Sequence, residues 1–530
     1  MKKRLLLHLA LLLFLGALSG LPTAVGNIPL LCFICHIPYA LYLKTSICGH
    51  KASLGRAYLA GLSYFMGYFA VSFSFFIAMY PLDFAGLSDA ASVAVLFAAM
   101  VLLPLFQAAP LALSALFMCQ MAKSRVFRIP ALFSIFFAAS ASLLFYLQNF
   151  TWAGVPWAPP VIGLASSPVF IQTASLFGSS FLTFFIFLIN ALVAEGYDAF
   201  RHCLDKRAAL SVLAALLLFL GNSGIGALLL QRNTADSRSV KVALIQGCAP
   251  ISEFYTQASH LNSCRYLAKR AAAQSPDIML WSETALERSL EKDSASKLLF
   301  SSIAEETGAI QIIGAFSSPE NEDAYYNALF VFYPDGSLSE EVYHKRRPVP
   351  FGEYLPMAEL FKIILPALTE INMLSRDIDP GRDSALFHLP DFTAGGLICF
   401  DSIYPALARD SVKDGADILL IPTNDSWFDG SFGKTLHCSH AVLRAVENGR
   451  PVARTGNTGL SVLINEKGEI IASAIPDQSD EITGVLSLSS SDTLYTATGD
   501  VFMLLCFAVL IFCPMIFAVY DKIKQRKDLL

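Results

Sequence analysis

The sequence predicts a polytopic α-helical membrane domain joined to one soluble α/β domain. Of its 530 residues, 55% are hydrophobic and only 15% are charged, which is far more apolar than an ordinary soluble protein. The apolar runs end near Gln231 and resume only near Thr498. Between these points, short β-branched runs alternate with amphipathic stretches. We therefore expect a transmembrane domain over residues 1–235, a soluble domain over 240–490, and a last span with a basic tail over 498–530.

About eight apolar runs are long enough to cross the hydrocarbon core of a bilayer as helices. The first run follows three basic residues and by itself has the pattern of a secretory signal peptide, but the further spans make cleavage unnecessary for insertion. The predicted spans are 5–21, 28–43, 57–80, 91–119, 130–147, 169–194, 208–230 and 501–519.

The distribution of Lys and Arg predicts which way the spans run. Basic residues cluster in alternate connections, near residues 2–4, 44–56, 123–128, 201–207 and 522–527, whereas the intervening short loops contain neither Lys nor Arg. By the positive-inside rule, both termini are cytoplasmic and the soluble domain lies on the opposite face. In a bacterial inner membrane that face is the periplasm.

The soluble domain reads as alternating strands and helices. The predicted strands are 242–246, 277–281, 310–315, 328–333, 393–399, 418–421, 460–464 and 482–486, and the predicted helices are 259–273, 294–306, 403–413 and 435–448. This alternation indicates an α/β layered domain with its own hydrophobic core.

Composition and motifs argue against several kinds of partner. A net charge of -5 and the lack of a basic stripe argue against nucleic acid. The CxxC pair Cys32 and Cys35 lies inside an apolar run, so neither a metal finger nor a disulfide framework is indicated. His437 and His440 lack a third ligand, which favours a surface or core pair over a metal site. With no phosphate-binding glycine loop visible either, we expect no metal and no cofactor.

Three reactive side chains lie near the ends of predicted elements, where functional groups of α/β domains gather. Glu283 follows the predicted strand 277–281, Lys345 lies in a basic run, and Cys399 ends the predicted strand 393–399. A cysteine attacks a carbonyl as its thiolate, so it needs a base such as Glu283. Lys345 would stabilise the thiolate and the oxyanion. Taken singly, these residues could be a helix-start carboxylate, a solvated charge and a buried cysteine, but together they favour a site.

The stretches around these residues resemble the nitrilase (carbon-nitrogen hydrolase) superfamily. In the family order Glu, Lys, Cys, they are 281–284 (WSET), 345–356 (KRRPVPFGEYLP) and 396–401 (GLICFD), followed by 424–428 (NDSWF) and 444–457 (RAVENGRPVARTGN). The resemblance implies an αββα sandwich. It also matches Glu353 to a further family carboxylate that positions the triad, for which a loop-capping charge is the alternative.

The predicted spans indicate which family of the superfamily the chain resembles, because the soluble amidases and nitrilases of the superfamily lack membrane spans. The whole chain resembles the apolipoprotein N-acyltransferase family. That resemblance implies that Cys399 takes a fatty acyl chain from a phospholipid as a thioester. The acyl chain would then pass to the α-amine of the lipidated N-terminal cysteine of a diacylated apolipoprotein. Membrane lipid is therefore an expected partner, in the bacterial inner membrane.

Some residues depart from the family pattern without removing a triad member. Ser282 stands where the family usually has Pro, Asp401 stands where it has Glu, and Asp429 is an extra residue in the usual WFG run. The apolar stretch 357–368 is expected to be either a membrane-dipping lid for Cys399 or a buried helix packed on the sandwich.

Two other functions share the same motifs. A membrane-anchored amide hydrolase would use the same triad with water as the acceptor, but a single anchoring helix would suffice for it. A catalytically dead scaffold would have no need to retain all three triad residues. The number of predicted spans and the intact triad therefore favour acyl transfer on lipid.

Overall fold

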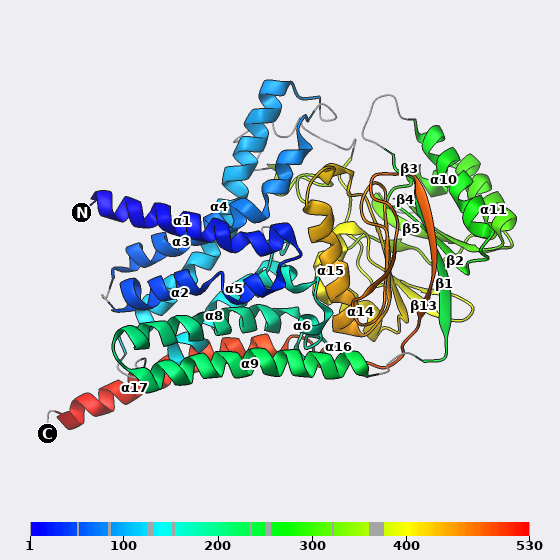
Figure 1. Cartoon of the computed structure of the whole chain (residues 1–530). Helices are drawn as coiled ribbons and strands as arrows, with labels where there is room; N and C mark the ends of the chain where they lie inside the picture. The colour runs from blue at the N-terminus through cyan, green and yellow to red at the C-terminus, as the bar shows by residue number, and fades with distance from the viewer. Residues whose placement is uncertain are drawn as a thin grey trace. The chain divides into compact units, whose positions relative to one another are not determined.

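The computed structural model describes residues 2–528 except 50–51, 83–85, 125–126, 128, 130, 151–153, 233–235, 250–255, 321–322 and 360–375. Its contacts divide the chain into two compact units (Figure 1). A helical unit comprises Met1–Ile77, Val95–Arg232 and Thr498–Leu530, and an α/β unit comprises Ala78–Ala94 and Asn233–Ala497.

Helices account for the first unit. They are α1 (Lys2–Val25), α2 (Ile37–Tyr42), α3 (Leu54–Ser72), α4 (Asp89–Met121), α5 (Leu132–Leu147), α6 (Pro168–Ile171), α7 (Ala174–Phe177), α8 (Ser179–Arg201), α9 (Asp205–Gln231) and α17 (Val501–Asp528). Among the described residues, seven helical segments are long and apolar enough to cross a membrane: Lys3–Val25, Pro29–Gly49, Asp89–Met121, Leu132–Phe150, Ser179–Arg201, Asp205–Gln231 and Val501–Ile523.

Two of the predicted spans differ in the structure. The span predicted at 57–80 is shorter, because α3 ends at Ser72 and a 3₁₀ turn follows. Arg56 and the tyrosines of α3 also keep its hydropathy below that of the seven segments. The run 169–194 is broken into α6, α7 and α8, and Gly178 separates the last two with a φ of +81°.

Small residues let α1 and α3 pack closely inside the helical unit. A Cβ atom at Gly16 would lie 1.8 Å from the carbonyl oxygen of Tyr64, and one at Gly67 would lie 2.0 Å from that of Leu13. Close approach at small residues is typical of helix pairs in lipid. Large apolar side chains on α9 and α17, such as Leu217, remain exposed, as expected for helices that face lipid.

Two sheets form the α/β unit. The first has the order β13-β1-β2-β4-β5-β6, with β3 beside β4, and the second has the order β12-β11-β10-β9-β8-β7. The first sheet contains β1 (Ser239–Gln246), β2 (Ile278–Trp281), β3 (Leu286–Ser289), β4 (Ile310–Ser317), β5 (Tyr326–Phe332), β6 (Tyr343–His344) and β13 (Asp480–Ser487). The second contains β7 (Leu386–His388), β8 (Thr393–Gly396), β9 (Ile418–Thr423), β10 (Val452–Gly456), β11 (Val462–Ile464) and β12 (Ile470–Ser473).

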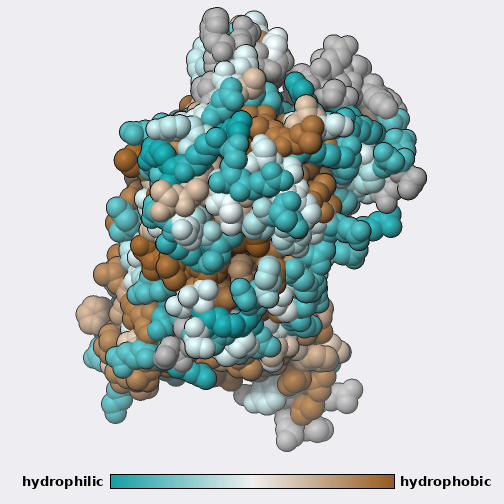
Figure 2. Space-filling view, turned by 90° about the vertical axis from the view of Figure 1, so that its right-hand side faces the viewer, coloured by the Kyte–Doolittle hydropathy of each residue, from teal (hydrophilic) through white to brown (hydrophobic). Residues whose placement is uncertain are grey.

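Helices cover the outer faces of the two sheets. They are α10 (Gln257–Ala272), α11 (Ser294–Thr307), α14 (Pro405–Lys413) and α15 (Gly433–Asn448), and the short α16 (Leu494–Thr498) follows β13. α10 and α11 pack on the first sheet, and α14 and α15 lie on the other side of the unit (Figure 1). The side that carries α10 and α11 is covered mainly by hydrophilic side chains (Figure 2). The unit is therefore the expected αββα sandwich.

Both sheets contribute to one apolar core between them. Leu244 and Leu280 come from the first sheet, Ile418 and Leu420 from the second, and all four are fully buried. Strands β1, β2 and β4 are parallel, as are β8, β9 and β10, so each sheet brings several carboxyl ends to one edge. This arrangement lets loops from both sheets meet at a common site.

Local capping explains where the surface helices begin and end. The side chain of Asp293 accepts a hydrogen bond from the backbone N–H of Ser296 at the start of α11, and Gly308 closes the helix in the left-handed conformation. Thr256 caps α10 in the same way.

The stretch 357–368 was expected to be either a membrane-dipping lid or a buried helix. Only residues 357–359 of it lie within the described residues, and the rest of that prediction falls outside them.

We expect Leu420→Ala to lower the free energy of unfolding of the α/β unit by about 2–5 kcal/mol, because it leaves a cavity between the two sheets. Leu298→Ala on α11 is the control, since that side chain is 73% exposed and its loss changes stability by about 0.5 kcal/mol or less. Thermal melting of the purified full-length protein checks the difference. Equal melting temperatures for the two variants would contradict the assigned core.

Candidate active site

A buried ammonium lies at the centre of the site. Lys345 follows β6 and is only 1% exposed, and its Nζ lies 2.8 Å from Glu283 Oε1 and 2.9 Å from Glu353 Oε1. A buried lysine keeps its charge only when it is paired and hydrogen-bonded. The structure thus brings together three of the four residues that the sequence singled out, in one ion-paired cluster.

Close packing of strands places Glu283 in the interior. Residues 282–284 follow β2 and cross β4 at Gly314, where a Cβ atom would lie 2.4 Å from the carbonyl oxygen of Ser282. Only a glycine permits this approach. Ser282, the departure from the expected Pro, is itself buried, and Glu283 beside it contacts Lys345.

Cys399 lies at a turn rather than at the end of a strand. The sequence predicted a strand over 393–399, but β8 ends at Gly396 and Cys399 begins a 3₁₀ turn with a φ of +49°. Left-handed backbone is unfavourable for a residue with a side chain and often marks a functional site. Its Sγ accepts a hydrogen bond from Thr423 Oγ1 at 3.2 Å, at the end of β9 in the same sheet.

The charges of the cluster act on both Lys345 and Cys399. Burial raises the pKa of the Cys399 thiol, the charge of Glu283 raises it further, and Lys345 only partly offsets these effects. Burial alone would lower the pKa of Lys345, but Glu283 and Glu353 hold it above its ordinary value. At neutral pH the lysine is therefore charged and the thiol protonated, so the thiol needs a base to become a nucleophile.

Asn327 joins the two carboxylates, and sequence reasoning missed it. Its Nδ2 donates to Glu283 Oε1 at 2.8 Å and to Glu353 Oε1 at 3.0 Å. The second oxygen of Glu283 accepts the backbone N–H of Asn424 at 2.9 Å. Asn327 lies within β5 in no recognised motif, so nothing in the sequence marked it, whereas Asn424 belongs to the NDSWF stretch.

Asp401 connects the segment that follows Lys345, called here the lysine loop, to the turn at Cys399, called here the cysteine loop. It is fully buried and accepts hydrogen bonds from the Tyr343 hydroxyl at 2.8 Å, from the backbone N–H of Arg347 at 2.8 Å, and from that of Ile398 at 3.1 Å. Burial raises the pKa of Asp401 to about 6, against the opposing charge of Lys345. The shorter carboxylate at this position therefore still reaches both loops.

A second buried network lies beside Cys399. Asp425 Oδ1 lies 2.7 Å from His437 Nδ1, Asp425 Oδ2 lies 2.6 Å from Arg454 Nη2, and all three side chains are fully buried. His437 Nε2 lies 3.1 Å from the carbonyl oxygen of Cys399. His437 is thus a core histidine that connects Asp425 to the backbone of Cys399. The sequence could have suggested this only if His437 had been paired with Asp425 and Arg454 of the neighbouring motifs. His440 is also buried.

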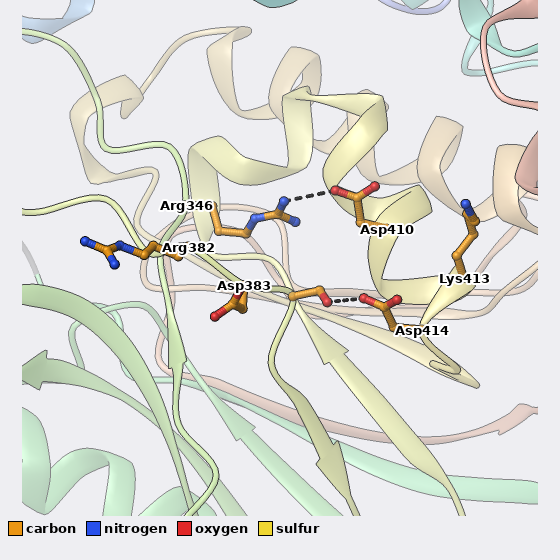
Figure 3. A pocket seen from close by; sticks show the side chains of 7 residues that line it. Arg346, Arg382, Asp383, Asp410, Lys413 and Asp414 are labelled. Carbon is orange, nitrogen blue, oxygen red and sulfur yellow. Dashed lines mark hydrogen bonds and ion pairs between the residues drawn. The ribbon is translucent and has the colours of Figure 1, made fainter.

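A polar pocket of about 250 Å³ is lined in part by Arg346, the residue after Lys345 (Figure 3). Its charged wall is held by hydrogen bonds from Arg346 Nη2 to Asp410 Oδ2 at 2.9 Å and from Ser384 to Asp414. The lining residues are Arg346, Arg382, Asp383, Ser384, Asp410, Lys413 and Asp414. These two bonds join α14 to Arg346, the residue after Lys345, and to Ser384. Near Ser384, the backbone N–H of Gly381 donates to the carbonyl oxygen of Lys345.

The sequence places the α/β unit in the carbon-nitrogen hydrolase class. The family model described as carbon-nitrogen hydrolase matches residues 241–493, and the model described as apolipoprotein N-acyltransferase N-terminal domain matches residues 15–192. Among solved structures, Nit3 of Saccharomyces cerevisiae, a member of branch 10 of the nitrilase superfamily, is 19% identical with a TM-score of 0.37, and covers 48% of this chain and 92% of its own.

Relatives that match both units identify the family. An apolipoprotein N-acyltransferase of Geobacter metallireducens is 30% identical over 68% of this chain and 70% of that protein. An apolipoprotein N-acyltransferase of Shewanella oneidensis is 28% identical over 95% of both chains. The chain belongs to the apolipoprotein N-acyltransferase family, and it is a membrane protein.

We expect opposite effects on the thiol when either charged neighbour is neutralised. Glu283→Gln removes a negative charge, lowers the pKa of Cys399 and speeds its alkylation by iodoacetamide at pH 8 by about tenfold, whereas Lys345→Met slows it. Peptide mapping by mass spectrometry measures alkylation at Cys399 alone. Glu287→Gln, at an exposed position on β3, is the matched control and leaves the rate unchanged. A change in the same direction for both site variants would contradict the electrostatic assignment.

Proposed function

We propose that this chain moves a fatty acyl chain from a phospholipid, through a thioester on Cys399, to the α-amine of the diacylglyceryl-cysteine of apolipoproteins. The observation that carries this proposal is the buried Lys345 ammonium held between Glu283 and Glu353, close enough for its charge to act on the Cys399 thiol. Membership of a family whose relatives are named apolipoprotein N-acyltransferases supports the choice of substrates.

The first half-reaction loads the enzyme. Glu283 takes the proton from the Cys399 thiol, and the thiolate forms a bond to the ester carbonyl carbon of the phospholipid. Two of the three N–H donors of Lys345 go to the carboxylates, which leaves the third for the developing oxyanion. The intermediate then breaks its bond to the glycerol oxygen. That oxygen takes the proton from Glu283 and leaves as a lysophospholipid.

The second half-reaction unloads the enzyme onto an amine. The neutral α-amine of the acceptor attacks the thioester carbonyl, and Glu283 takes the amine proton as the new N–C bond forms. The C–S bond breaks, Cys399 leaves as the thiolate and is reprotonated by Glu283. Atoms and charges balance without a cofactor. Glu353 and Asn327 act as positioning residues, because each contacts Lys345 or Glu283.

We further propose where this chemistry takes place. Residues 1–235 and 498–530 hold the enzyme in a bacterial inner membrane with both termini in the cytoplasm, and residues 240–490 form the catalytic domain in the periplasm. The apolar helices and the alternate placement of basic loops support this topology. Donor and acceptor are both anchored in the bilayer by acyl chains, so a membrane-bound enzyme meets them in the same plane.

Incubation of the purified protein with phospholipid is expected to add one fatty acyl mass that hydroxylamine removes, as it does from thioesters. Cys399→Ser does not form the hydroxylamine-sensitive adduct, whereas Cys203→Ser, at an exposed cysteine, behaves like the wild type. Intact-mass spectrometry and the release of lysophospholipid provide the two readouts. Failure of the wild type to form the adduct, together with hydrolysis of small amides, would replace this proposal with the amide hydrolase.

A further inference from the structure

Thr423 is a buried hydroxyl in direct contact with the nucleophile. It is the last residue of β9 and is fully buried. Its Oγ1 lies 3.2 Å from Cys399 Sγ and 3.1 Å from Asp425 Oδ1. A threonine hydroxyl has one proton, so it donates to only one of these two acceptors at a time.

Asp425 is held as a carboxylate, which can only accept. Burial would raise the pKa of Asp425, but the charges and hydrogen bonds of Arg454 and His437 hold it below its ordinary range. The contacts are 2.6 Å from Arg454 Nη2 and 2.7 Å from His437 Nδ1. A hydroxyl beside this permanent acceptor has a partner even when the sulfur carries no charge.

We propose that Thr423 is a further catalytic residue, whose hydroxyl donates to Asp425 while Cys399 is a thiol or thioester and turns to donate to the sulfur whenever the thiolate forms. The inference rests on the proposed role of Cys399 as the nucleophile. Rotation about one C–O bond exchanges the two acceptors, so no other group has to move. A hydrogen bond to an ionised acceptor is stronger than one to a neutral acceptor, so the hydroxyl favours the Asp425 carboxylate over a neutral sulfur and turns to the sulfur only when the sulfur is ionised too.

The charges around the sulfur give this hydroxyl its importance. Glu283 and Asp425 both disfavour the thiolate and Lys345 favours it, while the hydrogen bond from Thr423 also lowers the pKa of Cys399. Thr423 lies between the sulfur and Asp425, so its removal would leave the thiolate facing a carboxylate without a donor. The Thr423 hydroxyl is thus a neutral donor between the sulfur and Asp425. Without it, the negative charge of Asp425 would act on the sulfur directly and slow the formation of the thiolate.

The same network also supports the backbone of the nucleophile. His437 Nε2 lies 3.1 Å from the carbonyl oxygen of Cys399, and Ser402 Oγ donates to that oxygen at 2.7 Å. These contacts stabilise the left-handed conformation of Cys399. Asp425 is therefore connected to Cys399 by two sets of contacts, through Thr423 to the sulfur and through His437 to the carbonyl oxygen. In this account His437 is a positioning residue.

The test compares Thr423→Val with Thr455→Val in the full-length detergent-solubilised enzyme. Thr455 is equally buried and donates to the carbonyl oxygen of Leu280 at 3.2 Å, so its loss also removes a buried hydroxyl. We expect Thr423→Val to slow single-turnover acyl-enzyme formation from phospholipid by about 10- to 100-fold, the effect of losing one hydrogen bond to a charged group. Thr455→Val remains close to the wild-type rate.

Alkylation of Cys399 by iodoacetamide across pH 6–10 separates catalysis from structure. Thr423→Val is expected to move the alkylation profile to higher pH, and Thr423→Ser, which keeps the hydroxyl, rescues it. An unchanged profile in Thr423→Val, or an equal shift in Thr455→Val, would overturn the inference. Alkylation requires no lipid, so a wild-type enzyme that alkylates but never acylates would refute the proposed function while the profile still decides the role of Thr423.

Discussion

The Lys345 ammonium can remain charged inside the α/β unit only because two carboxylates lie within hydrogen-bonding distance of it. An isolated buried charge would cost several kcal/mol, and a lysine without partners would lose its proton instead. Glu283 and Glu353 must therefore both lie beside the Lys345 ammonium. Asn327 donates to an oxygen of each carboxylate, and the backbone N–H of Asn424 donates to the second oxygen of Glu283. The loops of the site are arranged around this requirement.

The double-sheet architecture meets that requirement by joining two sheets through one core. Glu283 and Lys345 follow strands of the first sheet, while Cys399 and Thr423 follow or end strands of the second. The shared apolar core fixes the register between the sheets, and Asp401 ties the lysine loop to the cysteine loop. Packing of the core between the sheets thus determines whether Glu283, Lys345 and Cys399 come together.

The sequence was sufficient to predict which residues are candidates for the site, but not which residues they contact. Glu283, Lys345, Glu353 and Cys399 stand in recognisable motifs, and the strand and helix periods predicted most of the sandwich. The predicted end of the strand at Cys399 was wrong, because the apolar run continues past Gly396, the last paired residue, and pairing depends on the neighbouring strand. Asn327 and Thr423 are ordinary strand residues whose importance comes only from what the fold places beside them.

The central claim is that a single thiol links the two half-reactions, and transfer from isolated acyl-enzyme tests it most directly. Enzyme loaded with a labelled acyl chain would be freed of phospholipid and mixed with a synthetic diacylated lipopeptide, either with a free α-amine or N-acetylated. The account predicts that the label leaves Cys399 and appears as an amide on the free-amine peptide only, in one turnover. Label that stays on the enzyme, or is released to water at the same rate with either peptide, would contradict it.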